Sequence, residues 1–401
     1  MTQWLTIIGM GEDGHAGLSA TAKLAIESAE VIVGSERLHA LLPKQKAETH
    51  LWPQPFAAAY KQVKSFAGRN TVLLTTGDPM NFGVARKLFE LLPHDEIKVV
   101  PHLSAFSLAA AKLGWSIPDC DFLTIHGRPA ANLEAFIQPD AKLLVLTQDE
   151  TSIAEACRRL IARGFEKSPI TVLENLGGDK ERITHFTADQ NPILNWSPLN
   201  TLAVHCIASP HAKIYSRVAG LPDEAFVHDG QLTKRDVRAI TLAALAPAPD
   251  QLLWDVGAGC GSIAIEWMRS TRGCEAEAIE QNETRCGMIA QNTDQLGTPR
   301  LKLIKGEAPA ALAGLERPHA IFIGGGVGDV GVFEACWQAL RSGGRLVANV
   351  VTIEGEMHLY DLQEKHGGEL VRIAISKLES VGKLRALKPK MPVTQWRMVK
   401  P

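Results

Sequence analysis

The sequence predicts an α/β protein of two domains, in which short apolar strands alternate with amphipathic helices. Three observations support this fold class. The chain has 401 residues, enough for two or three domains. It is 45% hydrophobic and 21% charged, so ordinary globular cores can form. The alternation stops near residue 212 and then begins again, which predicts domains at 1–211 and 212–401.

Eight short apolar runs are the expected strands of the first domain. They lie at residues 5–10, 31–34, 72–76, 97–100, 122–126, 142–147, 170–175 and 202–208. Helices are expected between several of them, for example at 82–92 and at 152–163, where apolar residues recur at helical spacing. Strands that are separated by helices predict largely parallel sheets with both faces covered.

Residues 209–232 separate the two halves. This segment has weak strand character and contains Pro210, Gly220, Pro222 and Gly230. Seven further strands are expected after it, at 252–256, 275–280, 301–305, 320–324, 345–351, 370–376 and 394–399. The last two runs have no helical pattern between them, so they are expected to be antiparallel.

Composition and charge argue against several classes of function. The formal net charge of −2 gives no general attraction to nucleic acid or to an anionic membrane. No apolar run approaches the roughly 18 residues of a membrane helix, and the first residues lack the pattern of a signal peptide. Seven scattered cysteines without a CxxC predict reduced thiols and a cytoplasmic location. The 13 histidines lack metal-binding spacing, so no metal is expected.

A glycine-rich stretch, DVGAGCGS at 255–262, begins the second domain's first strand–helix turn. Alternating glycines tolerate positive φ angles and let a ligand approach the backbone, while the following helix offers free N–H groups. Glu280 ends the next strand, where a carboxylate can accept hydrogen bonds from both hydroxyls of a ribose. The spacing GxGxG differs from the GxGxxG of dinucleotide folds.

This spacing, with Asp255 before it, resembles the class I S-adenosylmethionine-dependent methyltransferases, which have a Rossmann-like fold with an antiparallel last strand. The resemblance implies that loop and strand-end residues contact the cofactor: Gly257, Ala258, Gly259, Cys260, Gly261, Glu280 and Ala308. An ordinary tight turn is the alternative interpretation of the glycines.

The segment 221–240 resembles the entry segment of the corrin-precursor methyltransferases that act at carbon 15 and decarboxylate. The resemblance implies that Thr233 touches the methionine end of the cofactor. Lys234, Arg235 and Arg238 cluster beside it and are predicted to bind substrate carboxylates, a task that suits arginine. A solvated helix face is the alternative for this cluster.

The first half contains GDPMNFG at 77–83, which resembles the GDPxxYG motif of the tetrapyrrole methylases, with phenylalanine in place of tyrosine. Stretches at 8–19, 101–114, 122–128 and 172–183 match further motifs of that family in order. The resemblance implies a two-lobed class III fold that binds S-adenosylmethionine between its lobes. The residues implied are Gly9, Gly77, Asp78, Ser104 and Ala105 for the cofactor, and His126 and Arg128 for the substrate side.

Together the two resemblances predict a bifunctional enzyme of cobalamin biosynthesis with two S-adenosylmethionine sites. It would methylate a corrin precursor at carbons 5 and 15 and remove the ring C acetate carboxyl group, giving precorrin-8X. No catalytic residue is identified, because transfer from a sulfonium mainly requires proximity and alignment. A homo-oligomer without a nucleic-acid partner is expected. The alternatives are a non-catalytic N-terminal binding module, or another substrate.

Overall fold

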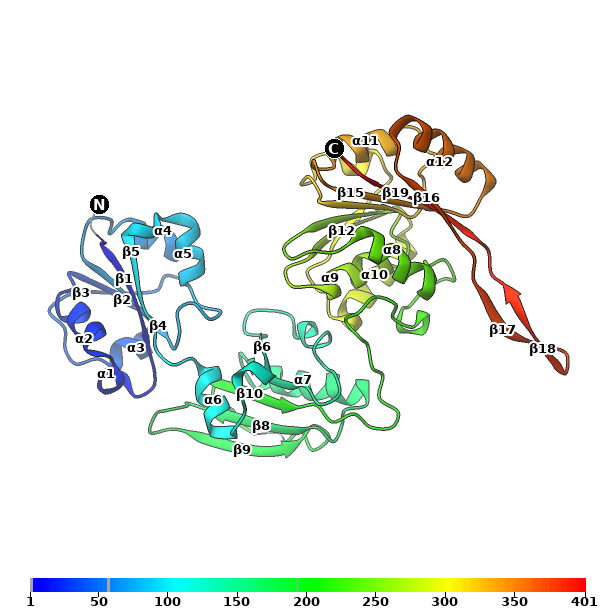
Figure 1. Cartoon of the computed structure of the whole chain (residues 1–401). Coiled ribbons are helices and arrows are strands. Elements are labelled where there is room, and N and C mark those ends of the chain that lie inside the picture. The colour runs from blue at the N-terminus through cyan, green and yellow to red at the C-terminus, as the bar shows by residue number, and fades with distance from the viewer. Residues whose placement is uncertain (1–2, 56–57, 193) are drawn as a thin grey trace. The chain divides into compact units, whose positions relative to one another are not determined.

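The computed structural model describes residues 3–55, 58–192 and 194–401, and the chain forms two compact units (Figure 1). The first unit contains Met1–Ala130 and Pro139–Lys213, and the second contains Ala131–Gln138 and Ile214–Pro401. The short segment 131–138 therefore groups with the second unit, an arrangement that no sequence pattern indicates. One of its contacts there is the hydrogen bond from the Gln138 amide to the Tyr215 carbonyl, at 2.7 Å.

The first sheet of the first unit is parallel throughout, in the order β3-β2-β4-β1-β5. Its strands are β1 (Leu5–Met10), β2 (Val31–Gly34), β3 (Glu48–Leu51), β4 (Thr71–Thr76) and β5 (Ile97–Val100). Helices cover both faces: α2 (Ala20–Glu27) and α3 (Glu36–Ala40) share one core, and α4 (Ala59–Lys64) and α5 (Ala85–Leu91) share the other. The short α1 (Gly14–Gly17) follows β1. The edge strand β3 was not predicted, because its side chains are mostly exposed.

The second sheet of this unit differs from the expected parallel arrangement. Its order is β6-β7-β10-β8-β9, and β6 with β7 is the one parallel pair given for it. The strands are β6 (Cys120–Thr124), β7 (Lys142–Leu146), β8 (Pro169–Glu174), β9 (Arg182–Thr187) and β10 (Asn200–His205). A short turn joins β8 to β9, so these two must be antiparallel. The helices are α6 (Ala105–Leu113), which packs on one face, and α7 (Glu150–Arg163).

The second unit contains a seven-stranded sheet in the order β13-β12-β11-β14-β15-β19-β16. Its strands are β11 (Leu252–Val256), β12 (Glu275–Glu280), β13 (Lys302–Lys305), β14 (Ala320–Ile323), β15 (Arg345–Val350), β16 (Glu369–Ile373) and β19 (Val393–Val399). Strands β11 to β15 are parallel, and β19 is antiparallel to both β15 and β16. The predicted antiparallel last strand is thus confirmed.

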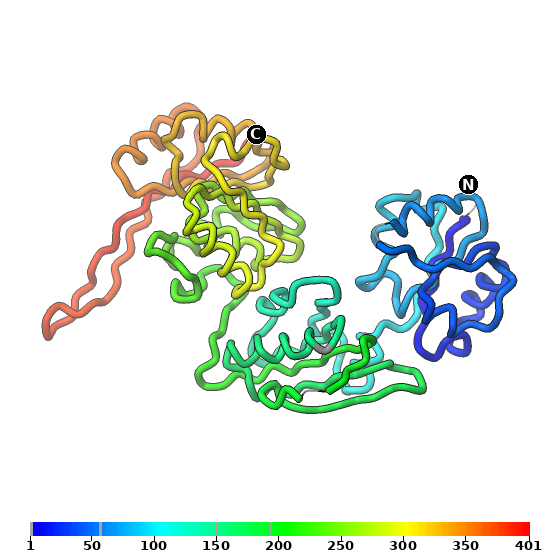
Figure 2. The backbone as a smooth tube through the Cα atoms, turned by 180° about the vertical axis from the view of Figure 1, so that it is seen from behind, coloured from blue at the N-terminus to red at the C-terminus, as the bar shows by residue number. Residues whose placement is uncertain are grey.

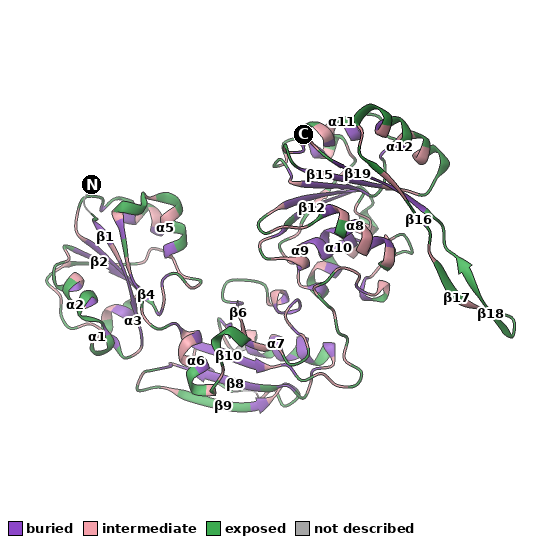
Figure 3. Ribbon diagram, viewed as in Figure 1, coloured by how far each residue is buried: buried purple, intermediate pink, exposed green. Residues whose placement is uncertain are grey.

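Helices cover both faces of this sheet, which explains why its central strands are continuous apolar runs. One core contains α8 (Arg235–Leu245), α9 (Ser262–Ser270) and α10 (Glu283–Leu296), and the other contains α11 (Val332–Ala339) and α12 (Ile353–His366). All five residues of β11 are buried, and Figure 3 shows the neighbouring strand β12 mostly in the colour of buried residues. The ends of the parallel strands are thereby held rigidly at one edge of the sheet.

A two-stranded hairpin, β17 (Ser376–Val381) with β18 (Leu384–Pro389), is inserted between β16 and β19. It extends away from the seven-stranded sheet, as the orange and red arm in Figure 2 shows, and most of its residues are exposed. The sequence did not predict these strands, because neither has a buried face whose alternation could be recognised.

Across the described ranges, no helix combines the length and the apolar character that crossing a membrane requires.

Candidate functional site

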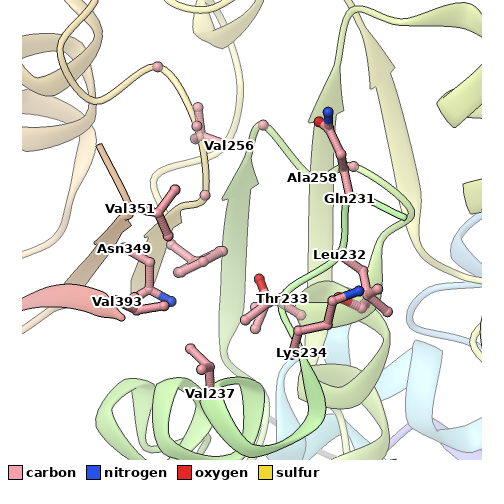
Figure 4. Close-up of a pocket in the computed structure, with 18 of the residues that line it drawn as sticks. Gln231, Leu232, Thr233, Lys234, Val237, Val256, Ala258, Asn349, Val351 and Val393 are labelled. Carbon is pink, nitrogen blue, oxygen red and sulfur yellow. The ribbon is translucent and has the colours of Figure 1, made fainter. Parts of the chain in front are cut away.

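A cavity of about 980 Å³ lies in the second unit at the carboxyl ends of the central strands. Its lining includes the loop 257–259, Glu280, the segment 306–308 and the segment 231–234. Figure 4 shows side chains of 231–234 facing the same space as Val351 and Val393. In open α/β sheets ligands bind at this edge, because the loops that follow neighbouring parallel strands converge there.

The glycine loop after β11 adopts backbone angles that favour glycine. Gly257 and Gly259 have φ angles of +69° and +60°, and a Cβ at Gly257 would lie 3.0 Å from the Gly325 nitrogen. Gly261, at φ +80°, caps helix α9 and lies outside the cavity lining. Cys260 is buried, burial raises the pKa of its thiol to about 11, and its carbonyl accepts a hydrogen bond from Asn292. Cys260 and Gly261 therefore lie beside the cavity lining, and their predicted cofactor contacts stay predictions.

Glu280 lies at the end of β12 with its carboxylate in the cavity wall. One oxygen accepts the backbone N–H of Gly259 and the other accepts that of Asn282, both at 2.8 Å. A carboxylate oxygen can accept a second hydrogen bond, so each keeps an acceptor position for a ligand hydroxyl. Ala308 also lines the cavity, as expected. These residues fit a nucleoside whose ribose hydroxyls bind Glu280.

Asp255 is buried behind the glycine loop. One of its oxygens accepts the backbone N–H of Ala264 in helix α9 at 3.0 Å, and the other has no hydrogen-bond partner among the described residues. Burial is the main cause that raises the pKa of Asp255 to about 7; the N–H of Ala264 opposes this shift, and the nearby charge of Glu280 adds to it. The carboxyl group therefore changes charge near neutral pH.

Arg238 does not occupy the position predicted for it. Its side chain is fully buried and lies outside the cavity lining. The guanidinium donates to Glu266 at 2.6 Å and Asp223 at 3.1 Å, and to the carbonyls of Leu221 and Thr233. Because its guanidinium N–H groups donate to these protein oxygens, Arg238 cannot bind a substrate carboxylate. It instead holds the segment 221–233 in place.

The neighbouring predicted residues have different positions. Thr233 and Lys234 line the cavity, whereas Arg235 is exposed and lies outside the lining. Lys377 and Lys390, at the base of the hairpin, also line the cavity, and the sequence analysis missed both. No local pattern could have identified them, because they become neighbours only when the hairpin folds.

In the first unit, three of the predicted motif loops meet. A Cβ on Gly9 would lie 1.9 Å from the Gly77 carbonyl oxygen and 2.7 Å from the His102 nitrogen, so only glycine fits there. A Cβ on Gly77, whose φ is +61°, would lie 3.3 Å from the Leu103 carbonyl and 3.7 Å from the Ala105 nitrogen. Gly9 is thus explained by backbone packing, and the predicted cofactor residues Gly77 and Ala105 are neighbours.

Side chains of these loops are partly committed to local hydrogen bonds. Ser104 caps helix α6 by accepting the N–H of Ser107 at 3.1 Å, and Asp78 accepts the N–H of Met80 at 2.9 Å. Both side chains can accept further hydrogen bonds.

The predicted substrate residues of the first unit are exposed. The Arg128 guanidinium lies 5.5 Å from the ring centre of Phe82, the residue that replaces tyrosine in the GDPMNFG motif. Phe82 has a φ of +56° and contacts Phe106 edge-on at 5.9 Å. For His126 the structure gives a hydrogen bond from its backbone N–H to the Thr124 hydroxyl. Arg128 is therefore brought to a motif loop by a cation–π contact.

No group of three or more His, Cys, Asp or Glu residues in the described parts of the chain could hold a metal ion.

The fold and the cavity define a class of protein. A seven-stranded sheet with an antiparallel last strand, a GxGxG loop and a carboxylate at the end of the second strand are the features of class I methyltransferases. The sequence model of the family "Precorrin methyltransferase domain" matches residues 224–400, and that of "Tetrapyrrole (Corrin/Porphyrin) Methylases" matches residues 4–191.

Curated relatives give a finer assignment. The chain is 43% identical over 401 residues to a Sinorhizobium precorrin-6Y C(5,15)-methyltransferase [decarboxylating], covering all of this chain and 97% of that one. A Mycobacterium tuberculosis protein of the same name is 38% identical over 400 residues, covering 99% and 100%. The chain belongs to this family. A solved C-terminal domain from Rhodobacter capsulatus is 45% identical, covering 46% of this chain and all of that one, with a TM-score of 0.44.

Removal of the Arg238 side-chain charge tests the structural role assigned to it. Arg238→Met leaves the buried carboxylate of Glu266 without its guanidinium, so the free energy of unfolding should fall by about 3–5 kcal/mol. Denaturant unfolding followed by circular dichroism measures this change. Arg235→Met, on the same helix but exposed, is the matched control and should change stability by less than about 0.5 kcal/mol. Equal effects of the two substitutions would refute the role.

The pKa of Asp255 predicts a pH dependence of stability. As pH rises from about 4 to about 7, the unfolded chain loses the Asp255 proton while the folded chain keeps it. The contribution of Asp255 to the free energy of unfolding should therefore fall by about 4 kcal/mol over this window and stay level above it. Asp255→Asn should abolish that part of the pH dependence, whereas exposed Asp361→Asn should retain it. Parallel pH profiles of wild type and Asp255→Asn would contradict the assignment.

Proposed function

We propose that this chain methylates a corrin precursor at carbons 5 and 15, and releases the carboxyl group of its ring C acetate as carbon dioxide to give precorrin-8X. The observation that carries the proposal is the 43% identity, over the full length, to a relative named for this activity. The cavity in the second unit supports it, because the cavity contains a ribose-binding carboxylate and has room beyond it.

The two units would divide the work. The second unit would perform the carbon-15 methylation and the decarboxylation, and the first unit the carbon-5 methylation. Separate family models cover the two units, which supports two methyl-transfer sites in one chain. The proposed cofactor contacts are Gly77, Asp78, Ser104 and Ala105 in the first unit, and Thr233, Gly257, Ala258, Gly259, Glu280 and Ala308 in the second. His126 and Arg128 are the proposed substrate residues of the first unit.

The chain's own residues mainly position the reactants and surround them with apolar side chains. Bound S-adenosylmethionine provides an electrophilic methyl group on its sulfonium. Glu280 and the glycine loop would hold the nucleoside, and this would set the direction of methyl transfer relative to the substrate carbon. Val351 and Val393 line the cavity and exclude water, which favours loss of carbon dioxide from a desolvated carboxylate. Homo-oligomeric assembly, a cytoplasmic location and the lack of a nucleic-acid partner remain predictions.

Cofactor binding tests the number of sites and the role of Glu280. Calorimetric titration of the full chain with S-adenosylhomocysteine should give two equivalents bound. Glu280→Gln should weaken one of the two sites by about 10- to 100-fold, because the charge-assisted hydrogen bonds to the ribose are lost. Glu275→Gln, on the same strand but exposed, is the control and should bind like wild type. A single equivalent in the wild-type chain would favour a non-catalytic N-terminal module instead.

Labelling of the product tests the division of work. With S-adenosylmethionine carrying a ¹³C methyl group, Glu280→Gln should lose carbon dioxide release and the label at carbon 15. Asp78→Ala should keep carbon dioxide release and lose the label at carbon 5. Nuclear magnetic resonance of the product and trapping of carbon dioxide provide the two measurements. Loss of carbon dioxide release in Asp78→Ala, with Glu280→Gln unaffected, would reverse the assignment.

A further inference from the structure

The base of the hairpin forms part of the cavity wall in the second unit. Several residues before and after the hairpin line the cavity: Ile373, Ile375, Lys377, Lys390, Met391 and Val393. The volume of about 980 Å³ is at the upper end of the roughly 300–1,000 Å³ of small-ligand pockets, so it leaves room for a ligand besides a nucleoside. The hairpin base thus combines an apolar surface with two ammonium groups.

At the base of the hairpin, positively charged groups outnumber negatively charged groups. Lys377 lies 3.2 Å from an oxygen of Asp236, while Lys388 and Lys390 share the single carboxylate of Glu379. Lys234, which also lines the cavity, donates to the Gly230 carbonyl at 3.1 Å. Three ammonium groups therefore share two carboxylates in these ion pairs, and Lys234 adds a fourth ammonium group.

The register of the hairpin adds to this imbalance. Lys377 of β17 lies directly opposite Lys388 of β18. Like charges in directly opposed positions destabilise a pair of strands. This hairpin has few buried side chains that could offset such a cost. A bound anion next to Lys377 would remove the repulsion.

We propose that Lys377 and Lys390, together with Lys234, bind carboxylates of the tetrapyrrole substrate that do not react. The apolar side chains beside them, Ile375 and Val393, contact the macrocycle. This inference rests on the proposed function, because it assigns the substrate-binding part of the same cavity. It replaces the role that the sequence analysis gave to Arg238, whose guanidinium is buried elsewhere.

Lys377 and Lys390 already have carboxylate partners in the protein, and a substrate carboxylate can exchange with such a partner. Lys377 is about half exposed, as is Asp236, so their ion pair is weak and a substrate carboxylate can replace Asp236 at little cost. Lysine also suits this task. Its ammonium group is a point charge on a flexible stem, so it can reach substrate carboxylates that project in different directions.

Kinetics of the full chain test the proposal. The double variant Lys377→Met/Lys390→Met should raise the KM for carbon dioxide release by about 10- to 100-fold, with little change in kcat and in the affinity for S-adenosylhomocysteine. Lys383→Met, in the turn of the same hairpin and outside the cavity lining, should behave like wild type. The double variant with arginine at both positions should keep most of the affinity, because it keeps the charge.

A variant with the opposite expected effect excludes a merely structural explanation. Asp236→Asn removes the carboxylate that competes for Lys377, so the KM should fall below that of wild type. A second measurement is calorimetry with a corrin polycarboxylic acid and with its methyl ester, in the presence of S-adenosylhomocysteine. Wild type should bind the acid more tightly than the ester, and the methionine double variant should lose this preference at one site.

The outcomes separate the two proposals. If wild type releases no carbon dioxide, the proposed function fails. If wild type is active and the methionine double variant keeps the wild-type KM, the function stands and the lysine site is refuted. If that variant also loses cofactor binding, Lys377→Gln takes its place, and an unchanged KM in Lys377→Gln would overturn the proposal.

Discussion

The buried ion pair between Arg238 and Glu266 holds together the part of the second unit on which the cavity depends. Glu266 lies in helix α9, directly after the glycine loop, and Arg238 lies in helix α8. Through the same guanidinium the carbonyls of Leu221 and Thr233 are fixed. A buried ion pair of this kind adds little net stability compared with apolar packing. Its effect here is geometric, because it fixes the entry segment against the helix that carries the cofactor loop.

The two units bring their glycine-containing motifs together with different backbone arrangements. In the second unit, a loop whose glycines have positive φ angles precedes helix α9. The carboxylate of Glu280, on the next strand, accepts a hydrogen bond from this loop. In the first, separate loops are packed so closely that a side chain at Gly9 would collide with the Gly77 carbonyl, while Gly77 itself has a positive φ angle and close neighbours. One site is built by a single turn, and the other by the meeting of segments that are about seventy and a hundred residues apart in the chain.

The sequence predicted the features that depend on local periodicity or on short motifs. Buried strands appear as short apolar runs, and the position of Glu280 follows from the length of one strand–helix–strand unit. Exposed strands such as Glu48–Leu51 lack an apolar pattern and were missed. Arg238 was assigned to the substrate because it clusters with Lys234 and Arg235 in the sequence. Its burial could not be predicted, because it depends on Glu266, which only the folded chain brings within hydrogen-bonding distance. Contacts between side chains that lie far apart in the sequence cannot be recognised from the residues next to them in the chain.

The hairpin is inserted between two strands that pair with each other. Strands β16 and β19 are adjacent and antiparallel, so a short turn alone could connect them. The pairing of these two strands therefore does not depend on the hairpin. Its base lies instead in the cavity wall, so the inserted strands add Lys377 and Lys390 to the cavity lining without interrupting the sheet.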